Sequence, residues 1–310
     1  MLETVHGGSA PAAPGEPSAR ATVDPLGEAI MEAAGEARTA LAVADPVKAV
    51  HELRKAFKRL RALLRLVRRE TGSREAAVEA RTLRRELGEA ARQLSGARDM
   101  AARREALDDL MEKDLLTPAL RKTAGRVLVP RGSQAQDAGL APHREELARL
   151  IAATETAATR LTGACRIPAL LRAMTGEYAI ARRLGRKVDP GDAESLHNLR
   201  KAVVAHRYQM ALVTHAWPAV GRVWEVELQR LREKLGKFQD LSVLLERLGQ
   251  ASLEGQPVPG WNAPLAEAAR ARQLRLTVSA LRLHARLFAE KPKAFRRRLA
   301  AYFDPVSVRE

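Results

Sequence analysis

The sequence predicts an all-α fold, and three observations support this prediction. Apolar residues recur at intervals of three and four through most of the 310-residue chain, which is typical of amphipathic helices. No segment alternates convincingly between apolar and polar residues, so strands are not expected. A motif near residue 50 also returns near residue 197, which indicates two copies of one helical unit.

The composition indicates a globular protein with a strongly basic surface. Hydrophobic residues make up 46% of the chain, enough to bury a core in one or two domains. The 53 Lys and Arg residues against 37 Asp and Glu give a formal net charge of +16, so we expect a polyanionic partner such as nucleic acid, anionic lipid or a phosphate polymer. Aromatic residues make up only 4%, which disfavours a single-stranded nucleic-acid site built on base stacking.

The N-terminal residues and the cysteine content bear on location. Residues 1–23 are rich in Ala, Gly, Pro and Ser without a signal-peptide pattern, and we expect a flexible tail. No apolar run is long enough for a transmembrane helix. The lone Cys165 excludes an internal disulfide and a multi-cysteine zinc site, and is expected to be a small buried hydrophobe. These features make the cytoplasm the expected compartment.

Residues 24–305 are expected to form the folded domain, in two helical halves at about 24–165 and 166–305. Helices begin after capping residues: Asp24 and Asp45, each followed by proline, and Ser73. The expected helices of the first half are 24–43, 46–71, 73–95, 98–111 and 142–161, with a weaker pattern after 122 and a loop at 129–142. Those of the second half are 167–184, 196–216, a long helix that ends near 249, 264–290 and a short helix that ends near 303.

The second of these helices carries two stripes. Its apolar face consists of Val50, Leu53, Phe57, Leu60, Leu64 and Val67. One residue further on, about 100° around the helix, stand six basic residues that we call the basic ladder: His51, Arg54, Lys58, Arg61, Arg65 and Arg68. Like charges at this spacing repel by a few tenths of a kcal/mol per pair, so an anion bound along the ladder would relieve the repulsion. A solvated charged face is the alternative interpretation.

The start of this helix returns half a chain later. The motif His-x-Leu-Arg at residues 51–54 recurs at residues 197–200, an offset of 146 residues. A Leu-x-x-x-x-Asp segment at 94–99 likewise recurs at 235–240, each time after a long amphipathic helix. Two motifs repeated in the same order indicate a duplicated helical unit, and we expect the copies to be related by a pseudo-twofold axis.

These motifs together resemble a known family. The pattern His-x-x-Arg-x-x-x-Lys-Arg-Leu-Arg from residue 51, Ala-Arg-Asp at 97–99, Leu-His-x-Leu-Arg at 196–200 and Leu-Gly-x-x-x-Asp at 235–240 resemble the CHAD family, α-helical domains named for their histidines. The resemblance covers about residues 25–303. It implies two pseudo-twofold-related four-helix bundles with a basic central pore or groove. It also implies binding of inorganic polyphosphate and, in many members, location on polyphosphate granules.

The resemblance and the ladder together give the candidate polyphosphate-binding residues. They are His51, Arg54, Lys55, Lys58, Arg59, Arg61, Arg65, Arg98, His197, Arg200, Lys201 and Arg207. In the second copy, Val204 and Ala205 replace Lys58 and Arg59, so we expect that half to bind phosphate less strongly. His206 falls on the apolar stripe of its helix, which favours a core histidine.

No motif for catalysis or for a cofactor is found in the sequence. The chain lacks a Gly-rich phosphate loop, a His-Glu-x-x-His metal motif and a nucleophile with a positioned base, so we expect no enzymatic activity, no cofactor and no metal. Asp99 and Asp240 are expected to orient a neighbouring Arg or Lys, or to cap a helix.

We therefore expect a non-enzymatic polyphosphate-binding protein, with other polyphosphate-granule proteins as further partners. Two alternatives stay open. One is a nucleic-acid-binding helical module, because charge alone does not distinguish phosphate polymers and nucleic acid could compete for the same surface. The other is a polyphosphate-processing enzyme.

Overall fold

The computed structural model describes residues 24–94, 98–129, 140–163, 165–214, 216–253 and 259–303. Within these ranges it contains eleven α-helices and no strand, which confirms the all-α prediction. The helices are α1 Pro25–Leu41, α2 Pro46–Leu63, α3 Arg74–Gln93, α4 Arg98–Glu112, α5 Pro118–Leu128, α6 Leu140–Thr162, α7 Ile167–Lys187, α8 Ala193–Thr214, α9 Pro218–Leu253, α10 Asn262–Leu287 and α11 Pro292–Phe303. The expected flexible tail at 1–23 lies outside the described residues.

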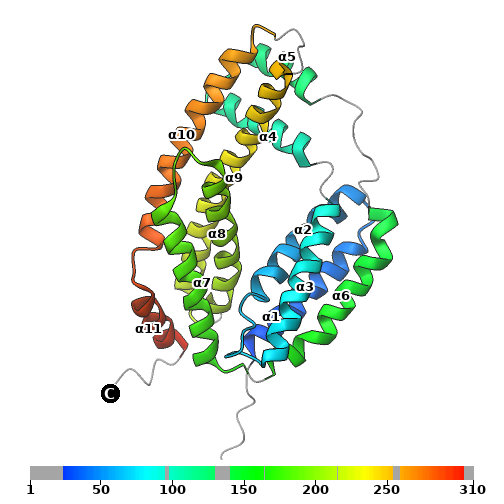
Figure 1. The fold of residues 1–310 in the computed structure, drawn as a ribbon, viewed down its shortest axis with the longest axis vertical. Coiled ribbons are helices and arrows are strands. Elements are labelled where there is room, and N and C mark those ends of the chain that lie inside the picture. Colours follow the sequence, from blue (N-terminus) through cyan, green and yellow to red (C-terminus); the bar gives the residue numbers. More distant parts are fainter. Residues whose placement is uncertain are drawn as a thin grey trace, which may run out of the picture.

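Two groups of helices make up most of the molecule (Figure 1). The first group consists of α1, α2, α3 and α6, and the second of α7, α8, α9 and α10, with α11 packed against α7. Helix α2 also packs against α8, and one continuous apolar core extends through both groups. The pseudo-twofold axis and the central pore or groove stay predictions.

Helices α4 and α5 pack away from the other helices of the first half. Helix α4 contacts α9 and α10, and these helices enclose a second apolar core with α5 (Figure 1). Leu110 of α4 and Leu244 of α9 are both fully buried in that core. At its edge, the buried carboxylate of Asp109 on α4 accepts hydrogen bonds from Lys237 of α9 at 2.7 Å and from Arg272 of α10 at 2.8 Å. Both apolar cores therefore contain residues from the two halves of the sequence.

The first three helices begin at the residues that the sequence predicts. Asp24 accepts a hydrogen bond from the Gly27 N–H at 3.0 Å and caps α1. Asp45 accepts one from the Val47 N–H at 2.9 Å and caps α2. Ser73 caps α3 in the same way. Each cap satisfies an N–H that lacks a partner inside the helix, so these starts are encoded locally.

The end of α2 differs from the expectation. The helix ends at Leu63 and does not continue to Gly72. Leu64 and Leu66 are both buried, at 1% and 0% exposure, although residues two apart on a helix point about 200° away from each other. A turn brings both to the core, and Thr71 Oγ1 stabilises it by donating a hydrogen bond to the Leu66 carbonyl at 2.7 Å. The last two residues of the basic ladder therefore lie beyond the helix.

Helix α5 was not expected, because the apolar pattern weakens after residue 122. The helix begins at Pro118, with Thr117 accepting a hydrogen bond from the Leu120 N–H at 3.2 Å, and continues to Leu128. Its apolar side is short: Ala124 and Leu128 are buried in the second core. Packing on distant helices thus stabilises a segment whose own periodicity is weak.

Candidate functional site

The first four residues of the basic ladder lie on α2. His51, Lys58 and Arg61 are exposed, and Arg54 is half-buried. Nη1 of Arg54 donates a hydrogen bond of 2.8 Å to the carbonyl of Leu94, the C-cap residue of α3. Arg54 therefore ties α2 to α3, and part of its donor capacity serves the fold.

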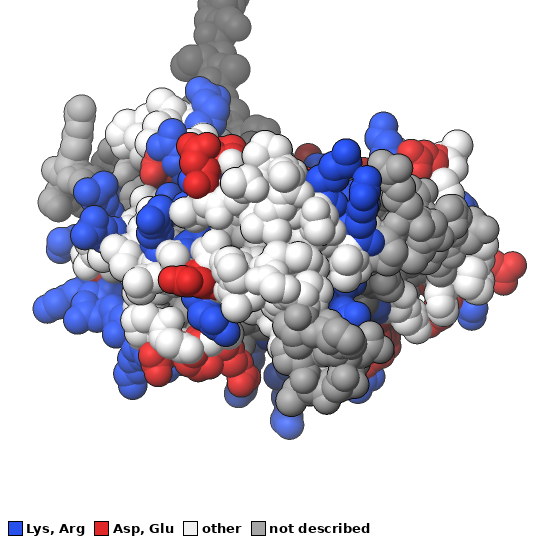
Figure 2. All heavy atoms as spheres, turned by 90° about the horizontal axis from the view of Figure 1, so that it is seen from above, with Lys and Arg blue, Asp and Glu red and all other residues white. Residues whose placement is uncertain are grey.

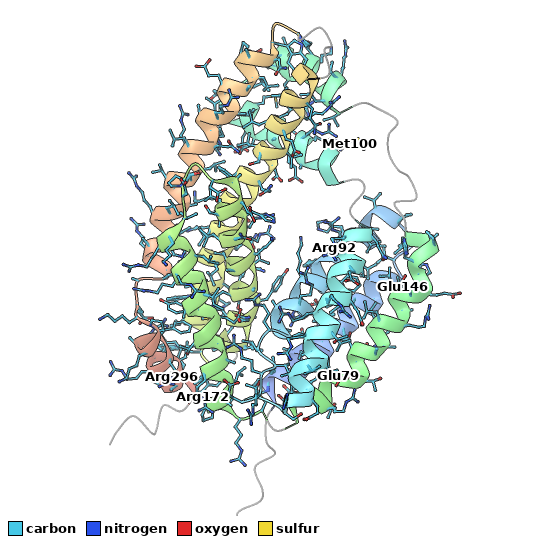
Figure 3. The ribbon with its side chains drawn as sticks, in the orientation of Figure 1. Glu79, Arg92, Met100, Glu146, Arg172 and Arg296 are labelled. Atoms are coloured by element: carbon cyan, nitrogen blue, oxygen red, sulfur yellow. The ribbon has the colours of Figure 1, made fainter. Side chains whose placement is uncertain are left out.

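Arg61 belongs to a group of like charges on α2 and α3. Its guanidinium lies against the α3 backbone at Gly88, where an added Cβ would lie 3.4 Å from the guanidinium carbon. The residue is exposed as a whole, but partial burial of its guanidinium against α3, followed by the charges of Arg92 and Arg65, lowers the pKa of Arg61. Figure 3 shows Arg92 near the end of α3. Burial and then the charge of Arg65 also lower the pKa of Arg84 on α3. These arginines repel one another, and a bound anion would relieve that repulsion.

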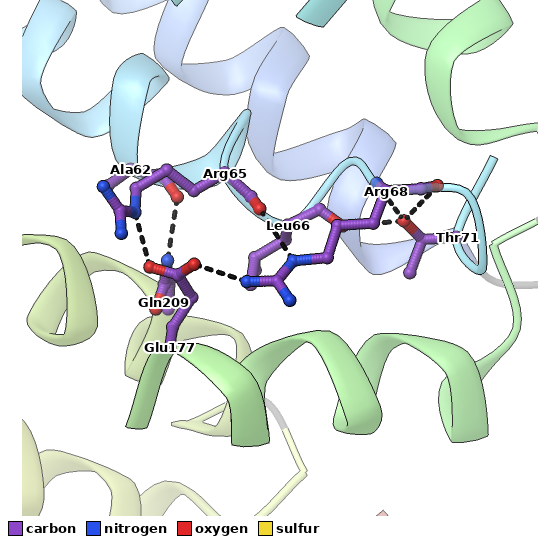
Figure 4. Close-up of polar contacts among 7 residues, drawn as sticks. All are labelled: Ala62, Arg65, Leu66, Arg68, Thr71, Glu177 and Gln209. Atoms are coloured by element: carbon purple, nitrogen blue, oxygen red, sulfur yellow. Dashed lines mark hydrogen bonds and ion pairs between the residues drawn. The ribbon is translucent and has the colours of Figure 1, made fainter. Parts of the chain in front are cut away.

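The ladder ends at a carboxylate from the other group of helices. Beyond α2, Arg65 and Arg68 both donate hydrogen bonds to Glu177 of α7, and the bond from Arg68 Nη2 measures 2.6 Å (Figure 4). Arg68 also lies against the α7 backbone at Gly176, where an added Cβ would lie 2.9 Å from Nη1. The side chain of Glu177 is only 6% exposed, so both guanidiniums are held by a buried partner.

A pocket of about 440 Å³ lies where the α2–α3 connection, α3 and α7 meet. Its charged lining residues, which we call the arginine pocket, are Arg65, Arg68, Arg69, Arg74, Arg81, Arg84 and Glu177. Sequence reasoning missed the three arginines from α3. Arg74, Arg81 and Arg84 are seven and three residues apart, a spacing that places them on one face of a helix and could have revealed them.

Two predicted residues on α2 are engaged with carboxylates. Arg59 turns toward α1, where it forms ion pairs with Glu32 and with Glu36, the latter at 2.7 Å. Lys55 is exposed and lies 3.3 Å from Glu52. The structure therefore does not bring Arg59 together with the basic ladder.

The second copy of the motif lies on α8. His197 and Arg200 are half-buried and Lys201 is exposed. The guanidinium of Arg200 lies against α9 at Gly236, where an added Cβ would lie 3.6 Å from Nη2. Arg54 and Arg200 thus occupy similar positions, since each lies against the longer helix that follows its own.

Arg207, the second predicted arginine of the second half, is also half-buried on α8. Its guanidinium carbon lies 5.3 Å from the ring centroid of Tyr208. The Nε atoms of Arg207 and of Arg232 on α9 are buried and have no hydrogen-bond partner among the described residues. Sequence reasoning missed Arg232. The side chains of Arg98 and Asp99 lie outside the described part of the chain.

His206 is a core residue, as predicted. It is 1% exposed, and its ring centroid lies 5.6 Å from that of Tyr178 and 5.3 Å from that of Phe288. Burial, followed by the positive charge of Arg298, lowers the pKa of His206 to about 3. Cys165 is buried as well, as expected of a small hydrophobe.

Comparison with known proteins places this arrangement in a family. A family model described as the CHAD domain matches residues 26–249. The chain belongs to the CHAD family. Among solved structures it is similar to PptA from Streptomyces chartreusis, with 19% identity, a TM-score of 0.60, and coverage of 86% of this chain and 99% of that chain. It is also similar to the CHAD domain from the plant Ricinus communis, with 21% identity, a TM-score of 0.47, and coverage of 90% of each chain. No curated protein sequence matches.

The described residues of this CHAD domain contain no group of three or more His, Cys, Asp or Glu side chains that could hold a metal ion. None of the helices described above is both long and apolar enough to cross a bilayer. What the site offers is a series of guanidinium and ammonium donors, which bind anionic oxygens without changing their own protonation.

Proposed function

We propose that this CHAD domain binds inorganic polyphosphate without processing it, along the basic ladder of α2 and the neighbouring arginines of α3. The observation that carries this proposal is the grouping of Arg61, Arg65, Arg84 and Arg92 where α2, its end and α3 lie together; burial first, and then neighbouring positive charges, lower the pKa of both Arg61 and Arg84. Holding such cations together costs free energy, and an anion that spans them repays it.

A linear phosphate polymer suits this surface. The polymer presents regularly spaced anionic oxygens but no base or shape to read, so its binder needs repeated point charges and forks. Arg supplies bidentate donors and Lys a compact charge. The buried Nε atoms of Arg207 and Arg232 support a contribution from α8 and α9. Polyphosphate binding is also what membership of the CHAD family implies.

Charge alone does not select the ligand or the face. Figure 2 shows Lys and Arg spread over one end of the molecule, with groups well away from its centre. The test must therefore distinguish the ladder from other basic surfaces. It must also distinguish polyphosphate from nucleic acid.

The decisive experiment titrates labelled long-chain polyphosphate at several salt concentrations against wild type and a Lys58→Ala/Arg61→Ala variant. A matched control, Arg282→Ala/Arg286→Ala, removes two exposed charges from α10, which packs mainly on α9. We expect the ladder variant to lose about 1.5 units of the slope of log K against log[salt], at roughly 0.7–0.9 per lost phosphate contact. The control should keep the wild-type slope. Equal slopes in the two variants would show that the ligand lies elsewhere.

Excess duplex DNA is added in a second arm. Polyphosphate that stays bound supports the proposal, whereas displacement by DNA at equal phosphate concentration would favour the nucleic-acid alternative. A third arm adds Mg²⁺ or Mn²⁺ and follows polymer length. Shortening of the polymer would contradict the non-enzymatic part of the proposal.

The proposal extends to location on polyphosphate granules, together with other granule proteins. A fluorescent fusion of wild type should concentrate on granules, and the Lys58→Ala/Arg61→Ala fusion should be diffuse. Granule location that survives the loss of both charges would mean that another partner recruits the protein.

A further inference from the structure

The arginine pocket differs from the basic ladder in shape and in the balance of its charges. The ladder runs along α2 and continues beyond it to Arg65 and Arg68, whereas the pocket, which includes those two arginines, is bordered by the α2–α3 connection, by α3 and by α7. Six arginines and one glutamate line it. The lining therefore carries a formal charge of about +5 around a small volume.

Part of the pocket is preorganised. Glu177 holds the guanidiniums of Arg65 and Arg68 from the α7 side (Figure 4). The backbone of Arg68 is fixed in turn, because its N–H donates a hydrogen bond of 2.8 Å to Thr71 Oγ1. Donors that are already positioned lose little conformational entropy when an anion binds, so the fixed guanidiniums of Arg65 and Arg68 favour a high affinity for anions.

The other arginines of the pocket have no such partner. Among the described residues, no carboxylate forms an ion pair with Arg69, Arg74, Arg81 or Arg84. Burial and the charges of Arg65, Arg61 and Arg68 lower the pKa of Arg84, and the opposing effect of Glu177 does not compensate. Four arginines thus line one pocket without an ion pair of their own among the described residues, and the one carboxylate in the lining, Glu177, is paired with Arg65 and Arg68.

The size of the pocket limits the ligand. A volume of about 440 Å³ equals that of about 15 water molecules, so a few phosphate groups fit with some of their water. A terminal phosphate suits such a pocket better than an internal one. It carries more negative charge and exposes three oxygens to bidentate arginine contacts.

We propose that the arginine pocket is a site for compact linear oligophosphates, taken either as free short molecules or as the terminal segment of a polymer. The polymer case rests on the proposed function, because the chain would then leave the pocket along the basic ladder. Glu177 acts as a positioning residue that fixes Arg65 and Arg68.

Inorganic triphosphate is the probe, and calorimetry on the full chain gives its Kd. The test variant is Arg69→Ala/Arg81→Ala, which removes two exposed pocket arginines without touching the core. The matched control is Arg296→Ala/Arg297→Ala on α11, whose position on the outer side of α7 is marked by Arg296 in Figure 3. We expect the pocket variant to weaken triphosphate binding at least about tenfold, since charge-assisted hydrogen bonds are lost, and the control to change it less than twofold.

Cyclic trimetaphosphate tests the preference for a chain end, because it has no terminal phosphate. We expect it to bind more weakly than linear triphosphate. Equal binding of the two anions would contradict recognition of a terminus. The site itself would be overturned by either of two results: wild type does not bind triphosphate, or the pocket variant binds it as tightly as wild type.

Long-chain polyphosphate separates the two sources of ligand and the two proposals. Polymer preparations of different mean chain length are compared at equal total phosphate. If Arg69→Ala/Arg81→Ala lowers the affinity for short chains more than for long ones, the pocket binds polymer ends. If the variant lowers the affinity for triphosphate and leaves that for the polymer unchanged, the pocket binds free oligophosphates. Lys58→Ala/Arg61→Ala should lower the affinity for long-chain polyphosphate and leave the affinity for triphosphate nearly unchanged. If the proposed role of the basic ladder is wrong, the polymer titrations will show it. If the proposed role of the arginine pocket is wrong, the triphosphate titrations will show it.

Discussion

The side-chain amide of Gln209 on α8 donates a hydrogen bond of 2.9 Å to the carbonyl of Ala62 in the last turn of α2. Carbonyls in a last turn have no partner within their own helix. Gln209 is fully buried, so water is not an alternative donor there. A residue from one group of helices thus completes a helix end in the other, close to the point where the basic ladder leaves α2.

Replacing Gln209 by methionine should weaken this junction. The change keeps an apolar side chain of similar length but leaves the Ala62 carbonyl buried without its donor, which costs about 1–3 kcal/mol. Urea unfolding should report this as a lower midpoint with an unchanged slope. Gln93→Met, at an exposed position at the end of α3, is the control and should stay within about 0.5 kcal/mol of wild type. Equal midpoints for the two variants would show that the bond contributes nothing.

His206 should make the fold sensitive to mild acid. Its pKa of about 3 in the folded state lies below the ordinary value of about 6.5 that applies after unfolding. As the pH falls below 6.5, the unfolded chain gains a proton that the folded chain does not, so stability decreases. The loss between pH 7 and pH 5 should be about 2 kcal/mol from this residue. His206→Phe should flatten the pH dependence of stability between pH 7 and pH 5 by that amount, and a variant as sensitive to pH as wild type would contradict this role.

Arg59 should contribute little to polyphosphate affinity, although its position in the motif implies phosphate contact. Burial lowers the pKa of Arg59, but hydrogen bonds and charges from Glu32 and Glu36 raise it overall, so its guanidinium is already satisfied. We expect Arg59→Ala to change the Kd less than twofold and the stability by less than about 1 kcal/mol. Arg61→Ala, two residues away, should weaken binding severalfold. A larger loss in Arg59→Ala than in Arg61→Ala would restore Arg59 as a ligand contact.

Asp109 should hold α4 on α9 and α10. Burial raises the pKa of Asp109, but hydrogen bonds from Arg272 and Lys237 lower it overall. Asp109→Ala leaves Arg272, which is 14% exposed, without its partner and should cost about 3 kcal/mol. The control is Asp108→Ala, since the neighbouring Asp108 forms an exposed pair with Arg121. This change should lower the free energy of unfolding by at most about 1 kcal/mol. Hydrogen exchange in α4 should rise for Asp109→Ala alone; equal exchange would contradict the role.

What the sequence predicts well is local. Asp24, Asp45 and Ser73 begin helices because each satisfies N–H groups a few residues away. The duplicated motif also predicts burial, since Leu53 and Leu199 are both 0% exposed. These features depend on spacing within one element, which can be read from the chain directly.

What the sequence does not predict depends on distant partners. The turn after Leu63 exists because Leu64 and Leu66 both reach the core, and the basic ladder is shortened as a result. The arginine pocket requires α3 and α7 to meet the α2–α3 connection, and residues 109 apart, Arg68 and Glu177, lie in contact only in the fold. The sequence therefore predicts the part of the candidate site on α2, but not the part beyond the helix, where Arg68 contacts Glu177.

The position of α4 and α5 affects how the chain acquires its structure during synthesis. These helices leave the ribosome before α9 and α10, yet they bury their apolar side chains against them. More than a hundred residues separate Leu110 from Leu244, so α4 and α5 remain without their final partners while that stretch is translated. Cutting the gene between α6 and α7 should therefore give two fragments that aggregate separately but assemble when they are produced together.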